Sequence, residues 1–460
     1  MNADAKFRKM TETPVPKLVI RLAIPTIISM LVTAIYNMAD TFFVGKLNTS
    51  ATGAVGIAFS LMAVFQAVGF TIGMGSGNYI SRLLGEKNTE YASKVTATSF
   101  FTSLATGIVI TISGLIFLDP LVNLLGATPT IAPYAKDYIS IILFGAPFII
   151  SSFVLNNIIR FQGSAFYAMF GIGFGGLLNI VLDPIFIFTL KMETAGAALA
   201  TVISQIFSFT VLLYVCGKGG NIKIKFRNFH PKWAIYKEVL RTGLPSFYRQ
   251  GLLSLAMMAL NQMARPFGDS VIAAMSIVGR AMGFAFSALI GLGQGFQPVC
   301  GFNYGAKRFD RVLEAFWFCI KVAFAGLLAA SIAGIIFAPQ IISAFRKEDA
   351  EVIAIGAKVL ILQCIPFPLS AWVVINTMLM QNIGKAKEAS VLSFARQGLF
   401  YIPLVLILPR LAGIWGIMLS QPIADVLTFC LSLPMGFRVI KELKSLGSQK
   451  TDFGLNVRKY

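Results

Sequence analysis

The sequence FTIGMGSGNYISRLLGEKN, residues 70–88, has a counterpart 220 positions later in LIGLGQGFQPVCGFNYGAKR, residues 289–308. Four residues match at this offset: Gly73, Gly75, Gly85 and Lys87 match Gly293, Gly295, Gly305 and Lys307. The same offset aligns Pro25 with Pro245, Ala54 with Ala274 and Gly196 with Gly416. The chain is therefore an internal duplication, and each half is expected to fold in the same way.

Each half contains six apolar runs that are long enough to cross a bilayer as helices, for which about 20 residues suffice. The runs of the first half are 18–44, 54–80, 95–118, 135–159, 166–190 and 195–216. Those of the second half are 242–264, 271–299, 312–338, 352–381, 390–409 and 411–433. Barrel strands are shorter and alternate polar with apolar residues. We predict an all-α membrane protein with twelve transmembrane helices in two pseudo-symmetric six-helix bundles.

The composition excludes an ordinary water-soluble protein, because 56% of the residues are hydrophobic and only 13% are charged. With the N-terminus inside, 27 of the 39 Lys and Arg residues fall in inner loops and tails, and 7 in outer loops. This bias places both termini in the cytoplasm of a plasma-membrane protein. The net charge of +19 is then directed at lipid headgroups and not at nucleic acid.

The duplication predicts the domain organisation. We expect an N-lobe at 1–217, a basic cytoplasmic linker at 218–241, a C-lobe at 242–437 and a cytoplasmic tail at 438–460. Six spans per copy give both copies the same orientation, and such repeats are typical of secondary transporters. The spans contain no HExxH or GxSxG motif and no His, and the five Cys have no CxxC spacing. We therefore expect a monomeric transporter, not an enzyme, with no cofactor and no metal beyond a transported Na⁺.

Three of the 20 acidic residues lie in the interior of apolar spans, more than two residues from either end, namely Asp40, Asp183 and Asp425. A carboxylate there is costly unless it is paired, hydrated or protonated, so each is a functional candidate. Asp40 and Asp183 lie at similar depth in the outer half of the first bundle, and Asn179 precedes Asp183 by one helical turn. Thr201 on the next span adds a hydroxyl at this depth. These oxygens suit Na⁺ or a shared proton. The alternative is that the two acids only hydrogen-bond neighbouring helices.

The second copy lacks this cluster, because Asp40, Asn179 and Asp183 correspond to Leu260, Leu399 and Pro403. Asp425 instead lies at a depth comparable to that of Arg396 on the preceding span. We expect these two side chains to pair, with substrate binding as the alternative. Pro25 leaves the carbonyl of Arg21 without its helical donor and allows a bend, which is either passive or coupled to cation binding. Arg280 and Lys321 are embedded without an assigned partner.

These residues carry a family resemblance. The chain resembles the multidrug and toxic compound extrusion (MATE) family, in the branch that includes MepA-type and DinF-like exporters. The motifs are LAIPTIISMLVTAIYNMADTFFVGKL (22–47), the paired stretches quoted above, LLNIVLDPIF (177–186), GAALATVISQ (196–205) and SQPIADVLTF (420–429). The resemblance implies two six-helix lobes, alternating access, and export of bulky hydrophobic, often cationic drugs driven by Na⁺ or H⁺.

The resemblance also implies roles for single residues. Asp40, Asn179, Asp183 and Thr201 fall on the first-lobe cation site and Pro25 on the helix-bending proline. Tyr36, Tyr138 and Asn156 fall on cavity-lining positions near that site. Some family members place acidic ligands in the second lobe, whereas spans 242–264 and 352–381 here contain no interior acid. A lipid or glycolipid flippase of the related superfamily is the alternative function.

Overall fold

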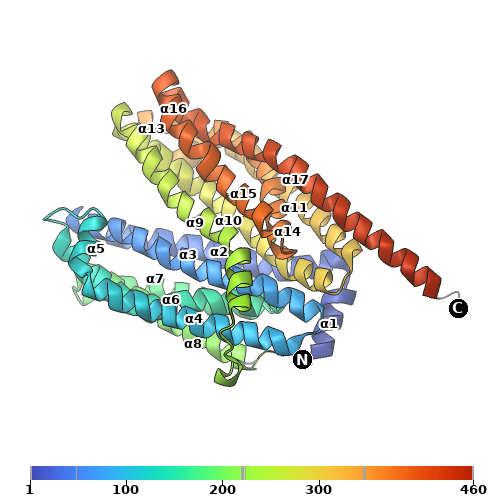
Figure 1. Ribbon diagram of the computed structural model, residues 1–460. Helices are drawn as coiled ribbons and strands as arrows, with labels where there is room; N and C mark the ends of the chain where they lie inside the picture. The colour runs from blue at the N-terminus through green and yellow to red at the C-terminus, as the bar shows by residue number, and fades with distance from the viewer. Residues whose placement is uncertain (1–2, 48, 219–221, 223, 346–348, 458–460) are drawn as a thin grey trace. The chain divides into compact units, whose positions relative to one another are not determined.

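The computed structural model describes residues 3–47, 49–218, 222, 224–345 and 349–457, without the side chains of residues 3, 40, 41, 49, 218 and 449–457. Within this part of the chain every regular element is helical and no strand occurs (Figure 1). The all-α prediction is therefore confirmed.

The helices of the first copy are α1 (Ala3–Glu12), α2 (Val15–Val44), α3 (Thr49–Gly85), α4 (Thr89–Ile116), α5 (Leu118–Leu124), α6 (Ala132–Phe161), α7 (Ala165–Pro184), the π-helix η1 (Ile185–Thr189) and α8 (Glu193–Lys218). The 3₁₀-helix η2 (Phe226–Asn228) follows. The second copy contains α9 (Trp233–Ala264), the 3₁₀-helix η3 (Arg265–Phe267), α10 (Asp269–Gly305), α11 (Phe309–Ile336), α12 (Ala338–Phe345), α13 (Ala350–Cys364), the 3₁₀-helix η4 (Phe367–Leu369), α14 (Ser370–Asn382), α15 (Ala386–Phe394), the π-helix η5 (Ala395–Tyr401), α16 (Ile402–Ala412) and α17 (Ile414–Val457).

Ten helical segments of the described chain are long and apolar enough to cross a membrane. The pair α13 and α14 makes an eleventh, bent by 42°. The run 352–381 is thus broken, and not continuous as expected, because Pro366 and Pro368 cannot donate helical hydrogen bonds. Helix α9, at the place of the seventh expected span, is 32 residues long but less apolar than these segments.

The two copies repeat each other in structure as well as in sequence. Helix α4 begins and ends 220 residues before α11, and α3 ends 220 residues before α10. The turns after α3 and α10 place Lys87 and Lys307 in the left-handed region, with φ of 60° and 57°. Lys seldom adopts this conformation. The matched lysines therefore report the same turn, built twice.

The helices form two compact units whose bounds differ from the expected lobes. Unit 1 comprises Met1–Met10 and Ile28–Gln250, and unit 2 comprises Thr11–Ile27 and Gly251–Tyr460. Helices α2 and α9 therefore each contribute one half to either unit. The expected linker belongs to unit 1, and its residues 233–241 already form the start of α9. Helix α17 runs on through Val457, because no proline after Pro434 interrupts it, so the expected tail continues the last span as helix.

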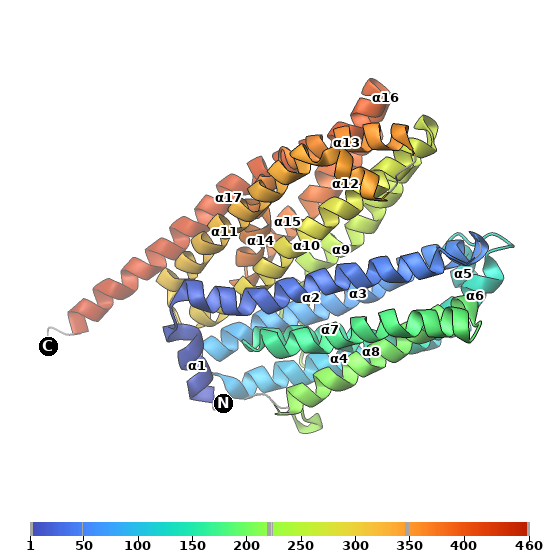
Figure 2. The same cartoon turned by 180° about the vertical axis from the view of Figure 1, so that it is seen from behind.

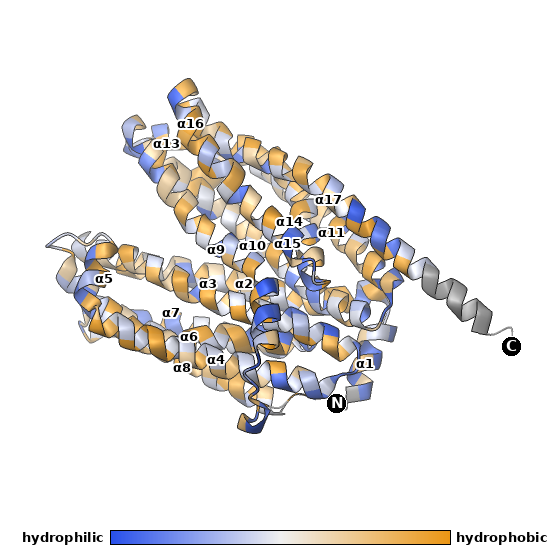
Figure 3. Cartoon of the chain, viewed as in Figure 1, coloured by the Kyte–Doolittle hydropathy of each residue, from blue (hydrophilic) through white to orange (hydrophobic). Residues whose placement is uncertain are grey.

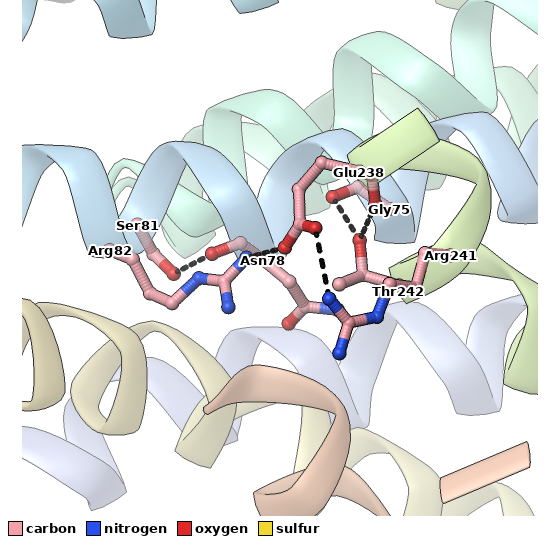
Figure 4. A network of polar contacts seen from close by, with 7 residues as sticks. All are labelled: Gly75, Asn78, Ser81, Arg82, Glu238, Arg241 and Thr242. Atoms are coloured by element: carbon pink, nitrogen blue, oxygen red, sulfur yellow. Dashed lines mark hydrogen bonds and ion pairs between the residues drawn. The ribbon is translucent and has the colours of Figure 1, made fainter. Parts of the chain in front are cut away.

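In unit 1, the first half of α9 is held closely against α3 (Figure 4). A Cβ atom on Gly75 would lie 2.0 Å from the carbonyl oxygen of Val239, so the approach requires glycine. Thr242 Oγ1 donates to the carbonyl of Gly75 at 3.0 Å. Arg82 and Glu238 form an ion pair at 2.5 Å. The glycine spacing of the repeated sequence 70–88 thus serves helix packing at this position.

The same device recurs in unit 2 between α10 and the first half of α2. A Cβ atom on Gly295, the repeat partner of Gly75, would lie 2.4 Å from Ala23 Cα. Thr26 Oγ1 donates to the carbonyl of Gly291 at 2.6 Å. Each unit therefore includes the first part of a helix whose second part belongs to the other unit, namely α9 for unit 1 and α2 for unit 2.

The centre of unit 1 is α6, which packs against α3, α4 and α8 (Figure 2). In unit 2, α14 contacts α10, α11 and α17, and every residue of α14 is buried. Apolar residues follow the lengths of the helices, and polar residues gather near their ends (Figure 3). This is the pattern that a bilayer selects.

Helix α1 packs on unit 1 outside the spans. The Lys87 ammonium lies 4.7 Å from the ring centre of Phe7, and Met10 is buried against Gly163. Lys6 is only 7% exposed, and burial, with a further contribution from Lys9, lowers its pKa to about 8. Burial of the charged Lys6 side chain therefore weakens the docking of α1 on unit 1.

Candidate functional site

The end of α7 positions the predicted cation ligands. Asn179 and Asp183 are one turn apart and share a helix face. Pro184 has no N–H to donate to the carbonyl of Ile180, and α7 gives way to the π-helix η1 directly after it. Single π-helical turns in membrane helices are often functional. The sequence therefore builds a local irregularity next to its most buried acid.

Three of the four predicted cation ligands are brought together in unit 1. Asn179 Nδ2 donates to Asp183 Oδ1 at 3.2 Å and to Thr201 Oγ1 at 3.4 Å. Asp183 is 0% exposed, Asn179 4% and Thr201 9%. Helix α8, which carries Thr201, approaches η1 at Gly196, where a Cβ atom would lie 2.7 Å from the Phe186 carbonyl oxygen. The result is a compact cluster of one carboxylate, one amide and one hydroxyl.

Asp40 lies on α2, but its side chain is outside the described residues. The level of its backbone follows from a contact between α2 and α7, where a Cβ atom on Gly176 would lie 3.0 Å from the Tyr36 ring. Asp40 is four residues beyond Tyr36, about 6 Å along α2. On α7, Asn179 and Asp183 follow Gly176 by about 4.5 and 10.5 Å. If both helices run in the same sense, as the span count predicts, Asp40 lies level with the cluster.

The two remaining residues predicted to line the cavity, Tyr138 and Asn156, both lie on α6 but contact different ends of unit 1. Tyr138 on α6 is 4% exposed and packs in the apolar core of unit 1 together with Ile187 and Ala198, so it borders the elements that carry the cluster. Asn156 Nδ2 instead donates to the carbonyl of Ala168 at 2.9 Å, near the start of α7. Fifteen residues of α7, about 22 Å, separate Ala168 from Asp183. The structure therefore does not bring Asn156 to the cluster, because its amide joins α6 to the opposite end of α7.

In unit 2, Arg396 Nε donates to Asp425 Oδ1 at 2.9 Å, so these two side chains do meet. Pro25 lies two residues before the point where α2 passes from unit 2 to unit 1. Sequence reasoning missed the π-helix η5, which contains Arg396, and the contact of Gln421 with Asp425. The repeat held a signal for Gln421, because it matches Thr201 at the offset of 220.

A family model, MatE, matches residues 25–185 and again 245–407, and the two matches start 220 residues apart. The chain belongs to the MatE family. Both copies that the sequence predicted are thus matched separately by one family model.

The relatives of this MatE-family chain are exporters by name. The multidrug export protein MepA of Staphylococcus haemolyticus is 28% identical over 434 residues, which covers 94% of this chain and 95% of that protein. MepA of Staphylococcus aureus, strain MSSA476, is 26% identical over 428 residues, covering 92% and 94%.

The solved structures agree with this family. A crystal structure of MATE in complex with MaL6 matches with a TM-score of 0.91 and 28% identity, covering 95% of this chain and 99% of that one. An outward-facing multidrug resistance MATE family transporter of the MOP superfamily matches with a TM-score of 0.89 and 29% identity, covering 95% and 98%. This MatE-family chain is therefore a multi-pass membrane transporter with the twelve-helix MATE fold.

Proposed function

We propose that this chain is a cation-coupled antiporter that exports bulky hydrophobic, often cationic drugs by alternating access. The observation that carries the proposal is the cluster of Asn179, Asp183 and Thr201, which is buried and confined to one copy of a duplicated transporter. The family and its MepA relatives support drug export in general. They do not favour the flippase alternative.

The chemistry of the cluster supports a small cation as the coupling ion. A fully buried carboxylate is stable only with a positive charge, hydrogen bonds or a proton. Asn179 donates one hydrogen bond to Asp183, and its side-chain carbonyl oxygen is of a type that also binds cations. Na⁺ and H⁺ both satisfy such a set of oxygens. Asp40 on α2 is the second carboxylate of the proposed site.

Coupling requires that cation binding changes the affinity for the drug. Helix α2 offers a route for this coupling. Its first part, with Pro25, belongs to unit 2, and its second part, with Tyr36 and Asp40, belongs to unit 1. An ion that draws α2 toward α7 biases the bend that Pro25 permits. Lys87 and Lys307 lie in the turns after α3 and α10. Their positive charge supports a cytoplasmic location for these turns and, with the expected number of spans, for both termini in the plasma membrane.

The experiment is transport in proteoliposomes loaded with ethidium, with a Na⁺ gradient and a pH gradient imposed separately. We expect one gradient to drive ethidium movement in the wild-type chain, and neither to do so in Asp183→Asn. The matched control is Asp119→Asn, which removes an exposed carboxylate paired with Lys136 in the same unit. Movement that needs no gradient, or that persists in Asp183→Asn, would contradict the proposal.

A further inference from the structure

Unit 2 contains a polar cluster that corresponds in place, but not in chemistry, to the cation cluster of unit 1. Both lie between the fifth and sixth spans of their copy, and Gln421 matches Thr201 at the offset of 220. In unit 1 the carboxylate belongs to the fifth span, at Asp183, whereas in unit 2 it belongs to the sixth, at Asp425. A π-helical segment accompanies each cluster, with η1 beginning two residues after Asp183 and η5 containing Arg396.

The Arg396 guanidinium occupies the place of a bound cation in this cluster. Its Nε donates to Asp425 Oδ1 at 2.9 Å, and Gln421 Nε2 donates to the same oxygen at 3.0 Å. On its other side the guanidinium carbon lies 4.5 Å from the ring centre of Phe286. A planar cation is thus held between a carboxylate and an aromatic ring, an arrangement that favours delocalised positive charge.

The pair is joined by one hydrogen bond, between Arg396 Nε and Asp425 Oδ1. Among the described residues, Asp425 Oδ2 and both Nη groups of Arg396 have no hydrogen-bond partner. The side chain of Asp425 is 8% exposed and that of Arg396 is 20% exposed. An arginine side chain that leaves such a pair regains rotamer entropy, which offsets part of the lost contact. A second cation then finds one carboxylate oxygen already open.

We propose that unit 2 contains a binding subsite for planar organic cations, in which the charged group of the ligand replaces the Arg396 guanidinium between Asp425 and Phe286. The inference rests on the proposed export function and deepens it, because it names the residues of unit 2 that hold the charged group of a cation whose charge is spread over a plane. Arg396 acts as an internal competitor. It keeps Asp425 neutralised when no ligand is present and lowers the affinity when one is.

Competition predicts opposite signs for the two members of the ion pair. Arg396→Gln frees the carboxylate, so the affinity for ethidium, a planar cation, should rise about tenfold. Asp425→Asn removes the charge that the ligand seeks, so the affinity should fall about tenfold. Phe286→Leu should weaken ethidium binding while having less effect on tetraphenylphosphonium, a non-planar cation. A purely structural pair would instead give losses of the same sign for Arg396→Gln and Asp425→Asn.

The test is fluorescence anisotropy of ethidium with the purified full-length chain in detergent and no ion gradient. Lys385→Gln is the matched control, because it breaks the Lys385–Glu442 ion pair elsewhere in unit 2 and should leave the affinity unchanged. Should Asp425→Asn fail to fold, Gln421→Leu and Phe286→Leu report on the same subsite. Unchanged or weaker binding in Arg396→Gln would overturn the inference.

The same assay separates this inference from the proposed coupling. Asp183→Asn should abolish gradient-driven transport but keep ethidium binding within about twofold of wild type. Opposite shifts for Arg396→Gln and Asp425→Asn support the subsite even where Asp183→Asn still transports. If Asp183→Asn abolishes gradient-driven transport but Arg396→Gln leaves the ethidium affinity unchanged, the subsite is refuted and the coupling proposal stands.

Discussion

Asp183→Asn should separate a cation ligand from a structural hydrogen-bonding residue, because the two roles predict opposite changes in stability. Asp183 is 0% exposed, and Asn179 donates to one of its oxygens at 3.2 Å. Without a bound ion, a buried carboxylate destabilises the fold by several kcal/mol, less what its hydrogen bonds return. The nearly isosteric amide removes the charge. The cation-free variant should therefore be more stable than wild type by about 1–3 kcal/mol.

Cation binding should change in the other direction. Breaking a buried charge pair by removing one partner costs about 3 kcal/mol or more, which corresponds to roughly a hundredfold weaker binding. Ion binding stabilises only the state that binds it, so the wild-type melting temperature should rise with added coupling ion. The variant should start higher and respond little.

The assay is thermal unfolding of the purified protein in detergent, titrated with NaCl at constant ionic strength and, separately, with pH. Asp119→Asn, an exposed carboxylate in unit 1, is the control and should follow the wild-type curve. A variant that melts several degrees below wild type without ions, yet shows the same ion-dependent rise, would refute our reasoning. Asp183 would then be a structural residue.

Three further predictions test the packing and the docked helix. Glu238→Gln breaks the Arg82 ion pair, with side chains 12% and 23% exposed, and should speed hydrogen exchange of the first turns of α9 about tenfold; unchanged exchange would show that the close packing alone holds α9. Gly75→Ala should destabilise unit 1 by about 1–3 kcal/mol, because its Cβ would lie 2.0 Å from the Val239 carbonyl oxygen. Gly326→Ala, within α11 and with no atom near its added Cβ, should instead stabilise the protein by about 0.5–1 kcal/mol in the same melting assay. Burial lowers the pKa of Lys6 from 10.5 to about 8, so the unfolded state binds more protons between these pH values. The docking of α1 should therefore strengthen as pH rises from about 8 to 10.5. In hydrogen exchange, α1 of Lys6→Met should be more protected than wild type at pH 7 and should lose this pH dependence.

The local patterns of the chain predicted much of the candidate site. Asn179 and Asp183 share a helix face in any α-helix, so their contact is a property of the spacing alone. Thr201 joins them because six spans of known direction limit the depth at which each residue lies. Asn156 shows where this reasoning ends. Depth along a span does not say which neighbour a side chain contacts, and its amide bonds to Ala168 at the other end of α7.

The helix bounds show the same division. The linker was expected to separate two lobes, yet its last residues begin α9, because helix formers continue and α3 offers a surface on which they pack. The break between α13 and α14 was readable in Pro366 and Pro368, whereas its angle of 42° was not.

The sequence by itself determined that this protein is a duplicated bundle of membrane helices with few buried charges. A bilayer leaves helices or closed barrels as the only spanning structures, and the length of the apolar runs selects helices. Only the tertiary structure decided that α2 and α9 are each divided between the units, and that Arg396 lies between Asp425 and Phe286. The physical reason is that hydropathy records contact with lipid, whereas the choice among buried neighbours depends on close packing between residues far apart in the chain.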